Sequence, residues 1–257
     1  MRLCVELPHP TIGTPLIESL QNPLVKHLVQ LREEKKYREQ QGSVLITGNK
    51  LVREVAAHFA PKMWFVTDIS TFSLDGEVYL VTPAVMKKIT GLPTPEPIAA
   101  EFPLPQPHDL IGKAPLLALD AIRDPGNLGT LVRTALALGW AGVFFLPTCV
   151  DLFHEKAIRA SRAAPFYLPW QTGTWEELEQ LCKTNNLKTY IADMEGVSLK
   201  AAPPTHQTLL LLSNEAQGVQ ERGMKFGQKI TIPMQTEMES LNVAIAGAIL
   251  MYTLNQS

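Results

Sequence analysis

The chain has 257 residues, of which 46% are hydrophobic and 19% are charged, so it can bury a sizeable core and global disorder is excluded. Its 23 Lys and Arg are offset by 25 Asp and Glu, which excludes an overall basic coat for nucleic acid but leaves room for a local patch. The most apolar stretch, 243–254, is shorter than the roughly 20 residues of a membrane span, and the 3 scattered Cys are typical of free thiols. We therefore expect a cytoplasmic protein without a membrane span.

The first part of the chain predicts a flexible arm and a small α/β domain. Residues 1–18 are rich in proline and threonine and show no periodicity. A helical pattern begins at Asn22-Pro23, and a second helix is predicted over 50–59. Short apolar runs predict strands at 44–46, 63–66 and 78–81. These elements define a domain over residues 19–92.

A proline-rich segment follows, with six prolines between Pro93 and His108. Proline disfavours both helix and strand pairing, so this segment is predicted to be an extended spacer. We place a linker at residues 93–111 and a second domain at residues 112–257.

The second domain alternates apolar strands with helices. Strands are predicted at 116–122, 143–146, 189–192, 208–212 and 229–232. Helices are predicted at 128–138, 155–163 and 175–184, with a last helix capped by Ser240 and running through Tyr252. Continuous apolar strands joined by helices predict a parallel sheet covered on both faces. In such sheets ligands bind at the carboxyl ends of the strands.

Three loops at that predicted edge carry polar residues. The first, Asp124-Pro125-Gly126-Asn127, suits a tight turn in which Asn127 caps the next helix. Arg133 lies off the apolar stripe of that helix, and taken alone it reads either as a surface arginine or as a functional one. The second loop runs Ser213-Asn214-Glu215-Ala216-Gln217-Gly218, and its small residues permit close approach of a ligand to the backbone.

The third loop begins with Ile232-Pro233-Met234 and continues to Ser240-Leu241-Asn242. Asn242 falls early in an apolar helix, where a buried amide must find a hydrogen-bond partner. The chain has no Walker loop, no Gly-x-Ser-x-Gly elbow and no metal-ligand spacing among its 6 His, so nucleotide-hydrolysis, serine-hydrolase and metal-centre readings have no support.

In order and spacing, the three loops resemble the three motifs of the SpoU (TrmH-like) RNA ribose 2′-O-methyltransferases of the SPOUT superfamily. The motifs read Asn127-x-Gly129-x-x-x-Arg133-Thr134-Ala135, then Leu212-Ser213-Asn214-Glu215-Ala216-Gln217-Gly218, then Ile232-Pro233-Met234 with Ser240-Leu241-Asn242-Val243-Ala244. The segment Arg159-Ala160-Ser161 is similar to a stretch between the family's motifs, and Ser213 stands where the family usually has glycine. The resemblance covers about residues 116–252, and residues 19–26 are similar to the start of the family's substrate-binding domain.

The resemblance implies an α/β SPOUT domain, with a mostly parallel sheet and a deep trefoil knot, behind a smaller RNA-binding domain. It implies transfer of a methyl group from S-adenosylmethionine to a ribose 2′-hydroxyl by a homodimer whose active site is completed across the interface. The residues that would organise catalysis are Arg133, Asn127, Glu215, Ser240 and Asn242. The residues that would hold the cofactor are Ser213, Asn214, Gly218, Ile232, Met234 and Leu241. No metal is expected.

The expected substrate is 23S-type ribosomal RNA. A tRNA ribose methyltransferase and a non-catalytic RNA-binding module of the same fold stay open as alternatives. RNA contacts are predicted for basic residues of the first domain, although this charge run reads equally well as a solvated helix face: Lys26, Arg32, Lys35, Lys36 and Arg38. Arg159 and Arg162 are predicted to contact RNA near the catalytic face.

Overall fold

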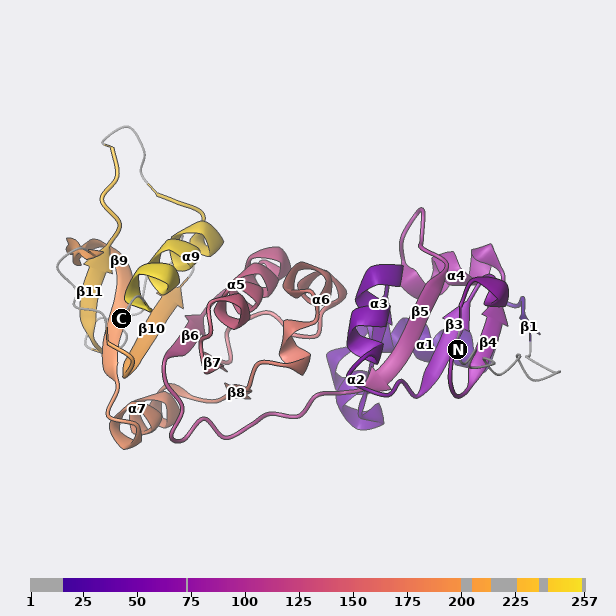
Figure 1. Cartoon of the computed structure of the whole chain (residues 1–257), viewed down its shortest axis with the longest axis horizontal. Coiled ribbons are helices and arrows are strands. Elements are labelled where there is room, and N and C mark those ends of the chain that lie inside the picture. The colour runs from indigo at the N-terminus through magenta and orange to yellow at the C-terminus, as the bar shows by residue number, and fades with distance from the viewer. Residues whose placement is uncertain (1–15, 73, 200–204, 214–225, 236–239, 256–257) are drawn as a thin grey trace, which may run out of the picture. The chain divides into compact units, whose positions relative to one another are not determined.

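The computed structural model describes residues 16–72, 74–199, 205–213, 226–235 and 240–255. The chain divides into two units, Met1–Leu104 and Pro105–Ser257 (Figure 1). The division falls inside the segment 93–111 that the sequence marks as a linker.

The first unit is built on a five-stranded sheet with the order β1-β4-β3-β5-β2. Its strands are β1 (Leu16–Ile17), β2 (Ser43–Thr47), β3 (Met63–Val66), β4 (Val78–Val81) and β5 (Ile98–Pro103). Its helices are α1 (Pro23–Glu33), α2 (Lys35–Gln41), α3 (Asn49–Ala56) and α4 (Pro83–Thr90), with a 3-10 turn η1 (Ile69–Thr71). Helices α1 and α4 pack on one face of the sheet, where their buried side chains join those of Leu45, Phe65 and Ala99 in one cluster.

The spacer prediction is wrong over Ile98–Pro103, which forms strand β5. This strand lies between β2 and β3 and pairs antiparallel with both. Pro97 precedes the strand and Pro103 is its last residue, so the residues between them keep the N–H groups that the pairing needs. The arm prediction is also wrong for Leu16–Ile17, which pairs with β4, while residues 1–15 lie outside the described residues.

The second unit contains a six-stranded sheet with the order β11-β9-β10-β6-β7-β8, and every pairing in it is parallel. Its strands are β6 (Leu116–Asp120), β7 (Gly142–Phe145), β8 (Trp170–Thr172), β9 (Lys188–Ser198), β10 (Thr208–Ser213) and β11 (Gln228–Thr231). Its helices are α5 (Pro125–Ala137), α6 (Glu155–Ser161), α7 (Trp175–Thr184) and α9 (Val243–Leu254), with a 3-10 turn η2 (Ala164–Phe166). The predicted parallel sheet is confirmed.

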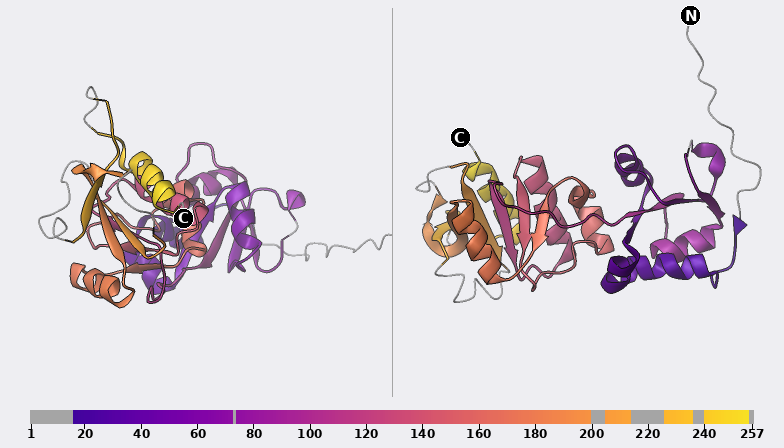
Figure 2. Two further views of the ribbon diagram at one scale, coloured as in Figure 1. Left: turned by 60° about the vertical axis from the view of Figure 1, so that its left-hand side comes forward. Right: turned by 90° about the horizontal axis from the view of Figure 1, so that it is seen from below.

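Helices cover both faces of this sheet (Figures 1 and 2). Helix α7 packs on one face, where Leu178 and Leu181 join Leu209 and Leu211 of β10 in a buried cluster. Helices α9 and α5 lie side by side on the other face. A side chain at Gly247 of α9 would collide with Leu131 and Leu212, so this glycine permits the close approach.

The trefoil knot implied by the resemblance stays a prediction, because parts of the C-terminal chain, 214–225 and 236–239, lie outside the described residues. Within the described ranges, no helix is long and apolar enough to cross a membrane.

Candidate functional site

The loops that follow β6, β10 and β11 leave the carboxyl edge of the parallel sheet. Ser213, the last residue of β10, pairs in register with Asp120, the last residue of β6. The first two motif loops therefore begin side by side, as the rule for open α/β sheets predicts.

A pocket of about 400 Å³ opens at this edge, a size within the usual range for small-molecule sites. Four residues predicted to hold the cofactor line it together with Ser240: Ser213, Ile232, Met234 and Leu241. Leu212, Ile230, Val243 and Leu250 give it apolar walls. Asn214 and Gly218, the other two residues of the predicted cofactor set, lie outside the described residues, as does Glu215. An apolar pocket with a few polar groups fits an adenosine-containing cofactor.

The first and third motifs are joined by a hydrogen bond between their asparagines. The Asn242 side-chain Nδ2 donates to Oδ1 of Asn127 across 3.0 Å. Asn242 is also the N-cap of α9, since its Oδ1 accepts from the backbone N–H of Ala244 at 2.9 Å and of Ile245 at 3.3 Å. One side chain thus starts the last helix and holds the first motif.

Two cap predictions are wrong. Asn242, and not Ser240, caps α9, and Asn242 is exposed at the helix start. Asp124, and not Asn127, caps α5, because its Oδ1 accepts from the Asn127 backbone N–H at 2.7 Å. The Asn127 side chain is therefore available to Asn242.

Arg133 is exposed in the third turn of α5. It does not line the pocket, and within the described ranges no hydrogen-bond or ion-pair partner holds it. The structure therefore brings Asn127 and Asn242 together and leaves the guanidinium of Arg133 at the surface, where a polyanion can reach it.

A buried carboxylate supports the first motif loop. Asp120 Oδ1 accepts from the hydroxyl of Thr148 at 2.8 Å, and the Thr148 Oγ1 accepts from the Ala121 N–H at 3.0 Å. Ala121 has φ of 51°, a left-handed conformation that is strained for a residue with a side chain. The Thr148 hydroxyl therefore fixes the bend through which the chain passes from β6 into the first motif. Burial raises the pKa of the neighbouring Cys149 thiol to about 12, which keeps it protonated.

Close packing explains the glycine of the first motif. A Cβ at Gly129 would lie 2.4 Å from the Ala157 carbonyl oxygen and 2.9 Å from the Ser161 N. Gly129 thus lets α5 rest directly on the backbone of α6, the helix that carries Arg159-Ala160-Ser161.

Sequence reasoning missed two charged residues of the pocket. Asp193 and Lys229 line it and form an ion pair of 2.9 Å between Nζ and Oδ2. Asp193 is the first residue after the predicted strand 189–192. Because ligands bind beyond the carboxyl ends of strands in such sheets, the sequence could have indicated Asp193 as a candidate binding residue.

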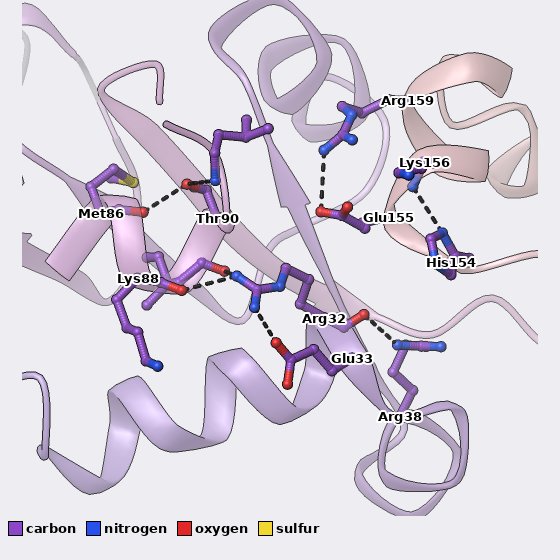
Figure 3. A network of polar contacts seen from close by, with 12 residues as sticks. Arg32, Glu33, Arg38, Met86, Lys88, Thr90, His154, Glu155, Lys156 and Arg159 are labelled. Carbon is purple, nitrogen blue, oxygen red and sulfur yellow. Dashed lines mark hydrogen bonds and ion pairs between the residues drawn. The ribbon is translucent and has the colours of Figure 1, made fainter. Parts of the chain in front are cut away.

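The RNA-contact prediction is wrong for Arg38. This side chain is buried in the first unit, where its Nη1 donates to the carbonyl oxygen of Leu31. It also donates to the carbonyl oxygen of Arg32 (Figure 3). Arg32 donates to the carbonyl oxygens of Lys88 and Ile89 and pairs with Glu33, which ties α1 to the end of α4. Lys26, Lys35 and Lys36 are exposed.

In the second unit, Arg159 pairs with Glu155 one turn earlier on α6 at 3.2 Å (Figure 3). Arg162 ends this helix in the left-handed conformation, with φ of 53°. Among the described residues, no group of three or more His, Cys, Asp or Glu is placed to hold a metal ion.

Comparisons with known proteins agree with this geometry. Residues 114–252 match the model of the SpoU rRNA Methylase family, and residues 22–100 match the MRM3-like substrate binding domain. The 23S rRNA (guanosine(2553)-2'-O)-methyltransferase RlmP of Bacillus subtilis is 31% identical over 93% of this chain and 98% of its own length.

Two solved structures extend the likeness to the whole fold. An AdoMet-bound rRNA methyltransferase from Sinorhizobium meliloti has a TM-score of 0.83 and 26% identity, and covers 95% of this chain and 98% of that one. A TrmH-family protein from Porphyromonas gingivalis has a TM-score of 0.80 and 30% identity, over 92% of this chain and 98% of its own. The chain therefore belongs to the SpoU rRNA methylase family.

Proposed function

We propose that this chain transfers a methyl group from S-adenosylmethionine to a ribose 2′-hydroxyl of 23S-type ribosomal RNA. The family match, the similarity to a 23S rRNA 2′-O-methyltransferase and the AdoMet-bound neighbour support this activity. The observation that carries it is the pocket itself. Ser213 of the second motif and Ile232 and Leu241 of the third motif line one cavity at the carboxyl edge of the sheet.

S-adenosylmethionine supplies a methyl group that its sulfonium already makes electrophilic, so the protein mainly positions the hydroxyl and assists loss of its proton. In this transfer the hydroxyl oxygen would form the new bond to carbon, S-adenosylhomocysteine would leave with the electron pair of the carbon–sulfur bond, and the hydroxyl proton would pass to water. The hydrogen bond from Asn242 to Asn127 holds the first and third motifs together. Arginine keeps its charge in proteins, so Arg133 acts as a cation that anchors a phosphate and stabilises the developing negative charge on the oxygen.

The active protein is proposed to be a homodimer. Helix α9 buries one side against α5 and β10 and leaves Ile245 (54% exposed), Ile249 (39%) and Tyr252 (57%) on its outer side. These residues, spaced by four and three, form an apolar stripe along the helix. The surface position of Arg133 on the neighbouring helix supports a site that a second copy completes.

A cytoplasmic location is proposed together with this activity, and the free thiols of Cys149 and Cys182 support it.

The test is transfer of tritiated methyl groups from S-adenosylmethionine to large-subunit ribosomal RNA and to tRNA, each lacking the modification, followed by digestion to nucleosides. Label in a 2′-O-methylnucleoside from the ribosomal RNA is the expected result. Label confined to tRNA overturns the choice of substrate. No label in either RNA together with no binding of the cofactor identifies a non-catalytic module.

A further inference from the structure

Strand β9 carries a bulge at the wall of the pocket. Along its pairing with β11, Lys229 lies opposite Ile191, but the next residue, Ile230, lies opposite Val197. Residues 192–196 are therefore extra residues on β9, and four of them line the pocket: Ala192, Asp193, Met194 and Glu195. Bulges beside active sites commonly redirect a side chain, and this one directs Asp193 toward the cavity.

Gly196 closes the bulge. A Cβ on this residue would lie 2.6 Å from the backbone of Ile230, so the chain can rejoin β11 here because glycine has no side chain. The bulge is thus built into the packing of the two strands.

The Asp193 carboxylate is fixed but keeps hydrogen-bonding capacity. Its Oδ2 pairs with Lys229 Nζ at 2.9 Å, and its Oδ1 accepts from the Glu195 backbone N–H at 2.8 Å. A carboxylate offers about four acceptor positions, and these contacts use one on each oxygen. The side chain is 16% exposed, so the remaining positions face a partly desolvated cavity, where a charge-assisted hydrogen bond is strong.

The positions of the residues proposed to act in methyl transfer indicate which part of the cofactor would lie next to the Asp193 carboxylate. Asn127, Asn242 and Arg133 do not line the pocket, so the sulfur of a bound cofactor would lie at its margin beside the first and third motifs. The remainder of the cavity has apolar walls that suit a purine ring. An adenosine placed there brings two vicinal hydroxyl donors next to its ring, and one carboxylate can accept from both.

We propose that Asp193 recognises the cofactor by accepting hydrogen bonds from its ribose hydroxyls, with Lys229 holding the carboxylate in place. This inference rests on the proposed function, because it takes the pocket as the S-adenosylmethionine site. It makes Asp193 a specificity-determining residue for the adenosine part of the cofactor, outside the three motifs.

The chain contains a matched control. Glu195 is two residues away on the same bulge and lies 3.9 Å from the same Lys229, yet its side chain is 89% exposed. Removing the charge of Glu195 therefore changes the electrostatic field around the pocket but leaves the Asp193 carboxylate, the proposed hydrogen-bond acceptor, in place. Lys229→Met is the second control, because it breaks the ion pair and leaves the Asp193 carboxylate in the chain.

The experiment measures binding by calorimetry, independently of methyl transfer, with S-adenosylhomocysteine and its 2′-deoxy and 3′-deoxy analogues. On the unchanged chain we expect at least one deoxy analogue to bind about 10-fold more weakly or worse. Asp193→Asn is expected to weaken S-adenosylhomocysteine binding about 10- to 100-fold and to bind that deoxy analogue nearly as well as the parent compound. Glu195→Gln is expected to keep the preference of the unchanged chain for S-adenosylhomocysteine over that deoxy analogue, because this side chain is not the proposed acceptor.

Three results overturn the inference. If the unchanged chain binds both deoxy analogues as tightly as the parent compound, no carboxylate accepts hydrogen bonds from the ribose hydroxyls. This result does not depend on whether the variants fold. If Asp193→Asn weakens all three ligands equally, or if Lys229→Met reproduces that uniform loss, Asp193 acts by supporting β9 and β11. If the chain binds no S-adenosylhomocysteine at all, both the proposed function and the role of Asp193 are overturned. If it binds S-adenosylhomocysteine but the ribose hydroxyls do not affect the affinity, only the role of Asp193 is overturned.

Discussion

The side chain of Asn242 donates a hydrogen bond to Asn127 while its own oxygen caps helix α9. The two residues are 115 positions apart in the chain, and the bond connects the helix that follows the third motif with the helix that carries the first. This link can be separated from the cap by mutation.

Asn242→Ser is expected to keep the cap, since serine caps about as well as asparagine, and to lose the contact with Asn127 because its side chain is shorter. Asn127→Ala removes the same contact from the other side. Both variants should retain the unfolding midpoint and lose methyl transfer about 10-fold or more, and the double variant should lose little beyond either single change. Asn242→Ala should in addition cost about 1 kcal/mol of stability through the lost cap. Thermal unfolding and single-turnover rates measure these effects, and additive losses in the double variant would contradict the coupling.

Arg133→Ala is expected to reduce methyl transfer by about 100-fold or more, because the cation proposed to stabilise the developing negative charge is removed. Cofactor affinity should be unchanged, since Arg133 does not line the pocket. Arg133→Lys keeps the charge but loses the planar fork, so it should recover part of the rate. Binding by calorimetry and incorporation of tritiated methyl groups into the RNA are measured on the same preparations. A fully active alanine variant would remove Arg133 from the mechanism.

The apolar stripe on α9 predicts the effect of charge on assembly. Ile249→Asp and Tyr252→Asp should convert the dimer to a monomer, because an unpaired carboxylate would be buried in the contact. Ile111, 60% exposed and outside α9, provides the control: Ile111→Asp should leave the mass unchanged. Light scattering at equal concentrations measures the mass. If the Ile249→Asp and Tyr252→Asp variants both remain dimers, the interface does not include this stripe of α9.

Gly129→Ala is expected to lower the free energy of unfolding. Alanine gains up to about 1 kcal/mol in helix propensity, but overpacking costs about 1–3 kcal/mol, and the Ala157 carbonyl at 2.4 Å is backbone that cannot rotate away. The overpacking term should therefore dominate. Ala137→Ser, at an exposed position of the same helix, should change stability by no more than about 0.5 kcal/mol. Urea unfolding curves of the two variants decide whether helix contact or propensity controls this position.

The thiol of Cys149 should resist alkylation in the folded protein. Burial raises its pKa to about 12, so at pH 8 almost none of it is the reactive thiolate, and Cys182 behaves alike for the same reason. In urea both should react at the rate of an ordinary thiol. Mass spectrometry of peptides after timed iodoacetamide exposure measures the protection. Rapid labelling of Cys149 in the native protein would contradict its burial.

The sequence predicts well the elements whose pattern is local. The expected strands 63–66 and 78–81 and the helix 175–184 agree with β3, β4 and α7, because each is an uninterrupted run with its own boundary signals, such as the capping box of Thr174 and Glu177. Strand β5 was not predicted because the prolines of 93–108 were counted by number and not by position. Pro97 precedes the strand and Pro103 is its last residue.

The site was predictable to the extent that its residues stand in motifs. Ser240 and Asn242 are equally good caps, so only the path of the chain decides which of them begins the helix. Asp193 directly follows the predicted strand 189–192, but the bulge that carries it depends on the register between β9 and β11, which no local pattern encodes. Arg38 looked like a surface residue of a charged run, but its guanidinium is buried on the carbonyl groups that end α1.

The position of β5 has a consequence for synthesis on the ribosome. In the first sheet β2 stands at the edge and has β5 as its sole partner among the described strands, although 50 residues of chain separate Thr47 from Ile98. During translation β2 and one side of β3 stay unpaired until residue 103 has emerged. A nascent chain that stalls before this point exposes two strand edges that invite pairing with other chains. The last strand made in the first unit is the one that completes its sheet.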